Sequence, residues 1–147
     1  PIILISFFSP VFHTISLLVC FIFFFDYYGK IMGKLTTHVL DTSKGVPASN
    51  MTIKLYYLDA DKKKLIGSFI TNKDGRVDHP LLEGSNFHQG RYELVFHVGA
   101  YQKNIDKTDT KNQFLNLIPI QFFISDNTHY HVPLLYSPYG YSTYRGS

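Results

Sequence analysis

The sequence is poor in cysteine and charge and lacks tryptophan. Its 147 residues include one cysteine, Cys20, and no Trp. A single cysteine excludes an intrachain disulfide and a zinc site built from several thiolates. Charged residues make up 17% of the chain and the formal net charge is +3, which is too mild to indicate a nucleic-acid binder. The fold must therefore depend on an apolar core or on contacts between subunits.

Charge is missing altogether from the start of the chain. Residues 1–25 contain no Lys, Arg, Asp or Glu, and the first basic residue is Lys30. We therefore expect a boundary between an apolar leader, residues 1–29, and one domain over residues 30–147, a common size for a domain.

The leader has three interpretations. A signal peptide would use Leu17–Phe25 as its apolar core, although the usual basic start is missing. A membrane span has enough length but is diluted by Pro10 and His13. An artefact or truncated leader is the third, since the chain begins with Pro. A signal peptide implies a secreted or periplasmic protein; an artefact leaves a cytoplasmic or peroxisomal one.

Phe and Tyr are abundant, with 13 and 11 copies, and both favour strands. Polarity alternates with a period of two in several segments, as in a half-buried strand. The segments predicted as strands are 34–41, 51–58, 64–71, 79–82, 91–98, 118–125, 129–136 and 141–145. With turns between them and one short helix within 99–113, the pattern predicts an all-β sandwich.

Two turns have consequences for the arrangement of the strands. Asn72-Lys73-Asp74-Gly75 is a strong turn signal, and Arg76 follows it directly. Asp126-Asn127 is a candidate two-residue hairpin turn into the strand that begins at His129.

Histidines stand on two of the predicted strands. A period of two puts His38 on one face with Thr36 and Leu40, and His129 on one face with His131. A histidine in an apolar strand is costly unless it is hydrogen-bonded or wet. Taken singly, each is explained by a solvated sheet face. Together the three imidazoles offer a metal site as an alternative that spacing alone does not establish.

Three segments together resemble the transthyretin-like family. The first is Thr37-His38-Val39-Leu40-Asp41 followed by Gly45-Val46-Pro47-Ala48, and the second is Thr71 to Arg76. The third is His129-Tyr130-His131-Val132-Pro133-Leu134-Leu135 with the terminal Tyr144-Arg145-Gly146-Ser147. The resemblance covers residues 33–147.

Four positions separate the two branches of this family. The carrier branch has Lys, Glu, Thr and Thr where this chain has His38, Arg76, His131 and Tyr144. The hydrolase branch has the residues found here. The resemblance therefore implies hydrolysis of 5-hydroxyisourate to 2-oxo-4-hydroxy-4-carboxy-5-ureidoimidazoline in urate catabolism. The alternative is a transthyretin-like carrier of small aromatic ligands.

The resemblance also implies a fold, an assembly and a site. The fold is a sandwich of two four-stranded sheets with one short helix, and the assembly is a homotetramer, a dimer of dimers, with the site in its central channel. His38, Arg76 and His131 are the expected catalytic residues. The expected substrate-binding residues are His38, Arg76, Tyr144, Arg145, Gly146 and Ser147. Neither a metal nor an organic cofactor is expected, and the partner is the small-molecule substrate.

Overall fold

A computed structural model describes residues 33–106 and 113–146, within a compact unit that begins at Gly33. The apolar leader and the boundary expected near residue 29 lie outside the described residues. None of the helices in the described ranges has the length and apolar character to cross a bilayer.

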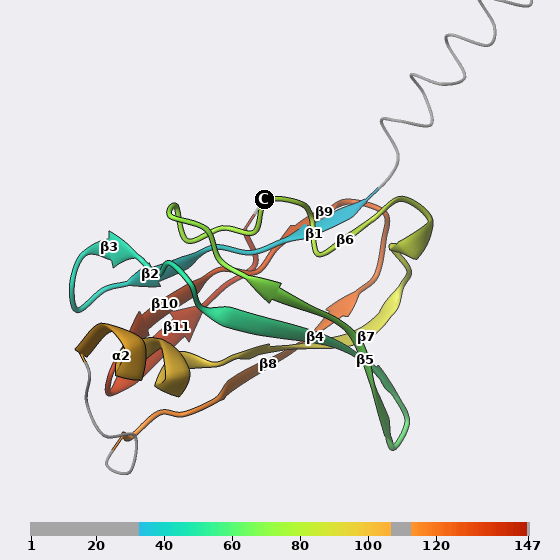
Figure 1. The fold of residues 1–147 in the computed structure, drawn as a ribbon. Coiled ribbons are helices and arrows are strands. Elements are labelled where there is room, and N and C mark those ends of the chain that lie inside the picture. The colour runs from blue at the N-terminus through green and yellow to red at the C-terminus, as the bar shows by residue number, and fades with distance from the viewer. Residues whose placement is uncertain (1–32, 107–112, 147) are drawn as a thin grey trace, which may run out of the picture. The chain divides into compact units, whose positions relative to one another are not determined.

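One layer of the fold is a fully antiparallel sheet of four strands (Figure 1). Its strands, in the order β5-β4-β7-β8, are β5 (Lys62–Ile70), β4 (Thr52–Asp59), β7 (Gly90–Phe96) and β8 (Ile118–Ile124). The alternation predicted from the sequence sets which face is buried. Met51, Ile53 and Leu55 are 0% exposed, whereas Thr52 and Lys54 between them reach solvent.

The second layer contains two short sheets joined end to end. One is β6-β1-β9, formed by β6 (Leu82–Glu83), β1 (Lys34–Thr36) and β9 (His129–His131). The other is β11-β10-β2-β3, formed by β11 (Gly140–Thr143), β10 (Leu134–Ser137), β2 (Val39–Asp41) and β3 (Val46–Pro47).

Each of two predicted strands, 34–41 and 129–136, is divided in the structure. The division falls at Pro133, which has no N–H to give to a ladder. The backbone remains connected on either side of it: Val132 N–H donates to Thr36 O at 3.0 Å and Leu134 N–H to His38 O at 2.8 Å. β1 with β2, and β9 with β10, therefore run on as two long strands with an interruption at the level of His38.

The helix α2 (Val98–Asp106) lies at one end of the sandwich (Figure 1). Tyr101 Oη donates to the buried Asp41 Oδ2 at 3.0 Å, and Tyr136 Oη donates to Gln102 Oε1 at 2.8 Å. These bonds join α2 to β2 and β10. A short 3₁₀ turn, η1 (Gly84–Asn86), is the other helical element in the described residues. The predicted all-β sandwich with one short helix is confirmed.

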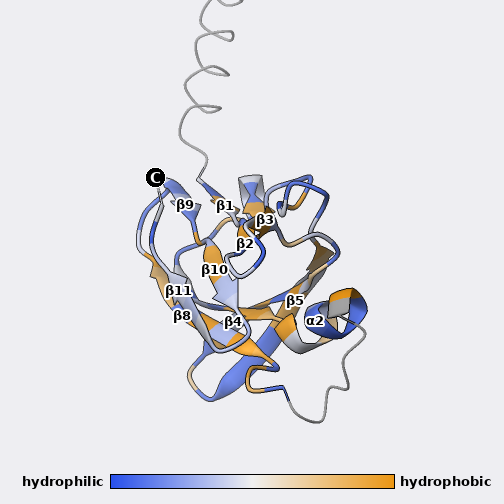
Figure 2. Ribbon diagram, turned by 90° about the vertical axis from the view of Figure 1, so that its left-hand side faces the viewer, coloured by the Kyte–Doolittle hydropathy of each residue, from blue (hydrophilic) through white to orange (hydrophobic). Residues whose placement is uncertain are grey.

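The core fills the space between the layers, and strands of both layers contain hydrophobic residues (Figure 2). Leu35, Val39 and Leu134 from the second layer are 0% exposed and belong to one cluster with Ile53 and Leu94 from the first. The inward positions of β1, β2, β9 and β10 are thus occupied, and the histidines of these strands take the outward positions.

The hairpin expected at Asp126-Asn127 is wrong. β8 pairs with β7, while β9 pairs in parallel with β1, so the connection crosses from one layer to the other. Asp126 Oδ1 still organises a local turn by accepting from Thr128 N at 3.1 Å. Turn chemistry predicted the turn, but the layer to which the next strand belongs is a property of the whole fold.

Candidate functional site

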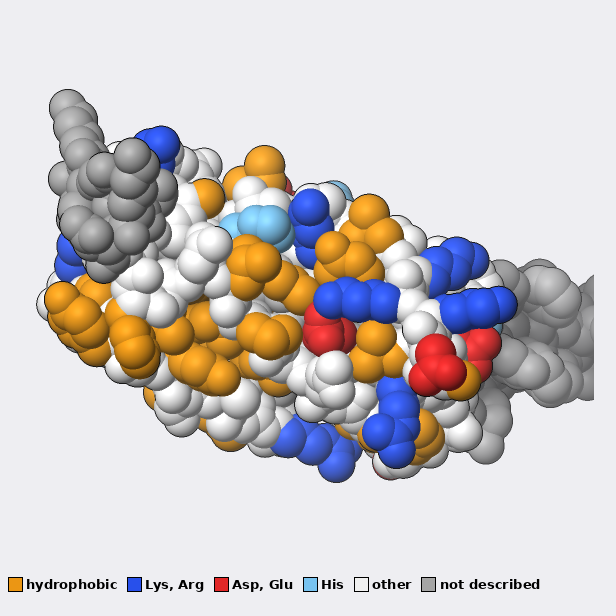
Figure 3. Space-filling view, turned by 90° about the horizontal axis from the view of Figure 1, so that it is seen from below, with side chains coloured by type: hydrophobic (Ala, Val, Ile, Leu, Met, Phe, Trp, Pro, Cys, Tyr) orange, Lys and Arg blue, Asp and Glu red, His pale blue; other side chains and the backbone are white. Residues whose placement is uncertain are grey.

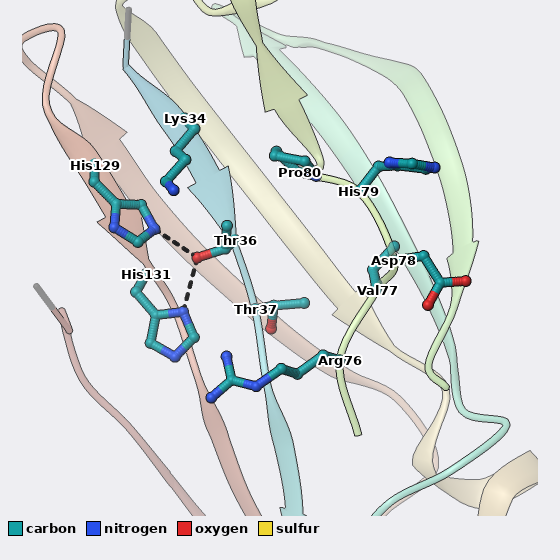
Figure 4. A pocket seen from close by; sticks show the side chains of 10 residues that line it. All are labelled: Lys34, Thr36, Thr37, Arg76, Val77, Asp78, His79, Pro80, His129 and His131. Carbon is teal, nitrogen blue, oxygen red and sulfur yellow. Dashed lines mark hydrogen bonds between the residues drawn. The ribbon is translucent and has the colours of Figure 1, made fainter. Parts of the chain in front are cut away.

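The outward face of β1 and β9 carries a pocket of about 390 Å³ (Figure 4). β1 and β9 are paired with Lys34 opposite His129 and Thr36 opposite His131. The two strands therefore present these four side chains together. The other wall is the segment after the turn at Gly75, with Arg76, Val77, Asp78, His79 and Pro80.

Thr36 stands between the two imidazoles. Its hydroxyl lies 2.7 Å from His129 Nε2 and 2.9 Å from His131 Nδ1, as the dashed lines in Figure 4 show. The histidine rings are 6.3 Å apart, centroid to centroid. The second nitrogen of His131 points away from Thr36 (Figure 4).

A tight turn brings Arg76 to this face. Asn72 Oδ1 accepts from the backbone N–H groups of Asp74 at 2.9 Å and Arg76 at 3.1 Å, and Gly75 takes a positive φ of 68°. Gly75 O accepts from Val39 N at 2.9 Å, which docks the turn on β2. As a result, His38 and Arg76 form an antiparallel bridge.

The surroundings of the site lower the pKa of its imidazoles and so favour their neutral form. Burial lowers the pKa of His131, and the positive charge of Arg76 lowers it further, followed by His129 and His38. Burial also lowers the pKa of His38, with Arg76 as the next cause, against a backbone hydrogen bond with Asp74 that raises it. Burial and then Lys34 lower the pKa of His129. A neutral imidazole near neutral pH has a free lone pair for accepting a proton.

The predicted catalytic residues thus meet on one face. Arg76 and His131 line one pocket, and His38 is bonded to the Arg76 segment and acts electrostatically on His131. The chemistry available is proton transfer by an imidazole beside a fixed cation. Among residues 33–106 and 113–146, no three His, Cys, Asp or Glu side chains gather closely enough to hold a metal ion.

The C-terminal residues divide between two places. Gly146 bridges His131, and a Cβ added to it would stand 2.8 Å from His131 Cδ2, so the chain end packs against the ring. Tyr144 and Arg145 instead line a separate hollow beside Tyr130. The Arg145 guanidinium lies 4.4 Å from the centre of the Tyr130 ring. Ser147 lies outside the described residues.

The sequence patterns did not single out Lys34 and Thr36 as residues of the pocket. Both share the outward face with His38, so a period of two contained the signal. Their contact with His129 and His131 depends on pairing between strands some 93 positions apart, which spacing does not reveal.

Comparisons with known proteins show the family. A family model described as the HIUase/Transthyretin family matches residues 35–146. A relative from Rhizobium meliloti (strain 1021), named 5-hydroxyisourate hydrolase 2, is 56% identical over 116 residues, 78% of this chain and 97% of that protein.

Two solved structures share the fold. The crystal structure of (S)-allantoin synthase has a TM-score of 0.73 and 45% identity over 79% of this chain, which spans 44% of that protein's length. The 5-hydroxyisourate hydrolase of Klebsiella pneumoniae has a TM-score of 0.66 and 31% identity, covering 78% of this chain and 99% of its own. A match over residues 35–146, on a transthyretin-like sandwich, means that this chain belongs to the HIUase/Transthyretin family.

Proposed function

We propose that this protein is an enzyme that hydrolyses 5-hydroxyisourate to 2-oxo-4-hydroxy-4-carboxy-5-ureidoimidazoline, a step of urate catabolism. The observation that carries the proposal is the pocket in which Arg76 stands with His131 and lowers the pKa of both His131 and His38. The relatives support it, since proteins up to 56% identical bear the name 5-hydroxyisourate hydrolase.

The proposed reaction needs a base, a water molecule and an oxyanion-stabilising group. A neutral imidazole, His131 or His38, takes a proton from water as the water oxygen attacks C6 of the substrate. The N1–C6 bond then breaks, N1 takes the proton from the imidazolium, and the carboxylic acid formed at C6 releases its proton to solvent to give the carboxylate. A positioned base typically contributes about 10²–10⁴-fold to the rate.

Arg76 is the proposed electrophilic partner. Its cationic guanidinium offers a planar set of donors to the carbonyl oxygen or the anionic form of the substrate. Lys34, which lies opposite His129 in the β1–β9 pairing, adds a second positive charge to the pocket. The two positive charges favour an anionic ligand.

We further propose that the active form is a homotetramer, a dimer of dimers. β5 and β8 end the four-stranded sheet, and β11 ends the second layer, so each offers an edge for pairing. Phe114 and Tyr139 are 72% and 82% exposed and touch at 6.4 Å between ring centres. Seen from below, apolar side chains also gather over one half of the surface (Figure 3). In a tetramer, Tyr144 and Arg145 would complete the site of their own or a neighbouring copy.

A coupled assay tests the activity. Urate oxidase generates 5-hydroxyisourate from urate, and the absorbance of the intermediate is followed with and without the purified protein. We expect ring opening far faster than the spontaneous reaction. His131→Thr should nearly abolish it, because the base is removed, and Arg76→Glu should lower kcat/KM by removing the cation.

The oligomeric state of each variant, measured by analytical ultracentrifugation, controls for unfolding. Binding of small aromatic ligands without any turnover by the wild-type protein would favour the carrier alternative. Unchanged activity of His131→Thr would remove His131 from the mechanism.

A further inference from the structure

The hydroxyl of Thr36 has one proton and two histidine partners. It lies within hydrogen-bond distance of His129 Nε2 and His131 Nδ1. A hydroxyl donates one hydrogen bond and accepts others, so it can donate to only one of these rings. The other ring must then donate to the Thr36 oxygen for both bonds to form.

If both neutral rings donated to the Thr36 oxygen, the Thr36 proton itself would have no acceptor among the described residues. Two proton arrangements satisfy both bonds and also place that proton between the rings. In the first, His131 Nδ1–H donates to Thr36 and Thr36 donates to His129 Nε2, which leaves His131 Nε2 with a free lone pair. In the second, His129 Nε2–H donates to Thr36 and Thr36 donates to His131 Nδ1. His131 then carries its proton on Nε2 and has no lone pair to offer a substrate water.

We propose that Thr36 is a positioning residue that couples the protonation of the two rings, so that His131 Nε2 is free to act as a base only while His129 is neutral. If His129 becomes an imidazolium, its Nε2–H must donate to Thr36, and among the described residues His131 Nδ1 is then the acceptor within reach of the Thr36 proton. The first arrangement, in contrast, is kept when His131 accepts a proton at Nε2, because Nδ1–H still donates to Thr36.

The surroundings favour the neutral form of His129, on which the first arrangement depends. Lys34 stands opposite His129 in the β1–β9 register, and its charge disfavours the imidazolium form of His129. Among the described residues, the other charged and titratable groups that line the pocket or act on His131 are His38, Arg76, Asp78 and His79. Lys34 therefore acts on the base through His129 and Thr36, in addition to any direct contact with a ligand.

The coupling itself does not need the protein to be a hydrolase; only its catalytic consequence rests on the proposed function. The first test is therefore spectroscopic. Long-range ¹H–¹⁵N spectra of the full-length ¹⁵N-labelled protein near neutral pH distinguish the two histidine tautomers. We expect His131 to carry its proton on Nδ1 in the wild type and in Thr36→Ser, which keeps the hydroxyl.

Thr36→Val keeps the β-branched shape but removes the hydroxyl, and we expect the His131 proton to move to Nε2. His129→Phe should act in the same direction, because the Thr36 hydroxyl loses its acceptor there and can donate to His131 Nδ1. Thr42→Val is the matched control: Thr42 Oγ1 donates to Tyr136 O at 2.8 Å, outside the pocket, so its loss should leave the His131 tautomer as in the wild type.

Kinetics give the second readout. Partners that orient a functional histidine at metal sites are worth about 10–100-fold in activity, so we expect kcat of Thr36→Val to fall about tenfold with little change in KM. Thr36→Ser should recover most of it. An unchanged His131 tautomer in both Thr36→Val and His129→Phe would overturn the coupling even if ring opening is observed. A shifted tautomer would support it even if the protein opened no ring.

Discussion

At the scale of single residues, the site is a set of imidazoles whose surroundings favour the neutral form. Burial is the largest cause of the lowered pKa of His38 and of His131, and the charge of Arg76 is the next for both. A lowered pKa means that the neutral form persists to lower pH. Activity that depends on a neutral imidazole should therefore be full above the ordinary histidine pKa of about 6.5 and be lost as pH falls below it.

The pH dependence of kcat/KM tests this. In the wild type we expect the acidic limb of the profile, where kcat/KM falls with falling pH, to lie below about pH 6.5. In Arg76→Gln the limb should move to higher pH, because removal of the cation makes the imidazolium easier to form. The measurement is the pH–rate profile of both proteins in the coupled assay. A limb at the same pH in both would show that Arg76 does not control the protonation of the base.

At the scale of elements, the turn that precedes Arg76 positions this residue beside His38. Gly75 and Gly45 both have φ of +68°, but their surroundings differ. A Cβ on Gly75 would clash with Val39 O and stand 3.2 Å from His38 Cδ2, whereas nothing lies within 4 Å of one on Gly45. The same backbone conformation thus lets the turn at Gly75 approach the backbone of β2 closely, whereas Gly45 lies in a loop with open space around it.

Substituting alanine at each of these glycines separates the cost of the left-handed backbone, which both share, from the cost of the clash, which only Gly75 has. Left-handed backbone costs a residue with a Cβ about 1–2 kcal/mol, so Gly45→Ala should lose about that much stability. Gly75→Ala should lose about 1–3 kcal/mol more, and it should also lower kcat/KM, because Arg76 and His38 are pushed apart. Urea unfolding and the coupled assay give the two readouts. Equal stability losses in the two variants would contradict the clash.

At the scale of the whole molecule, the residues expected to form the site line two separate hollows of one chain. Tyr144 and Arg145 line a hollow other than the histidine pocket, and Tyr144 is 56% exposed. If a second copy completes the channel, activity must depend on assembly. Association is concentration-dependent, so dilution favours separate subunits.

We therefore expect specific activity to fall when the protein is diluted below the concentration at which the tetramer dissociates. Activity is measured over a dilution series, and sedimentation velocity reports the oligomer over the same range. Tyr139→Glu, which places a charge on the most exposed aromatic ring of the described residues, should move both transitions to higher protein concentration. Constant specific activity across a range in which tetramers become monomers would contradict a shared site.

The sequence alone determined the all-β fold, the inward and outward faces of the strands, and the turn that precedes Arg76. These are local properties, since a period of two and turn chemistry act over a few residues. The histidines stand on the outward face because Leu35, Val39 and Leu134 occupy the inward one. The resemblance to a family added His38, Arg76 and His131 as a set.

Only the tertiary structure decided which side chains meet. β9 could have followed β8 in a hairpin; instead it pairs with β1, and that register sets Thr36 beside His131 and Lys34 beside His129. Register between distant strands is selected by the packing of the whole core, because a slip of one residue would turn every side chain to the opposite face. The shared proton of Thr36 is a consequence of that choice.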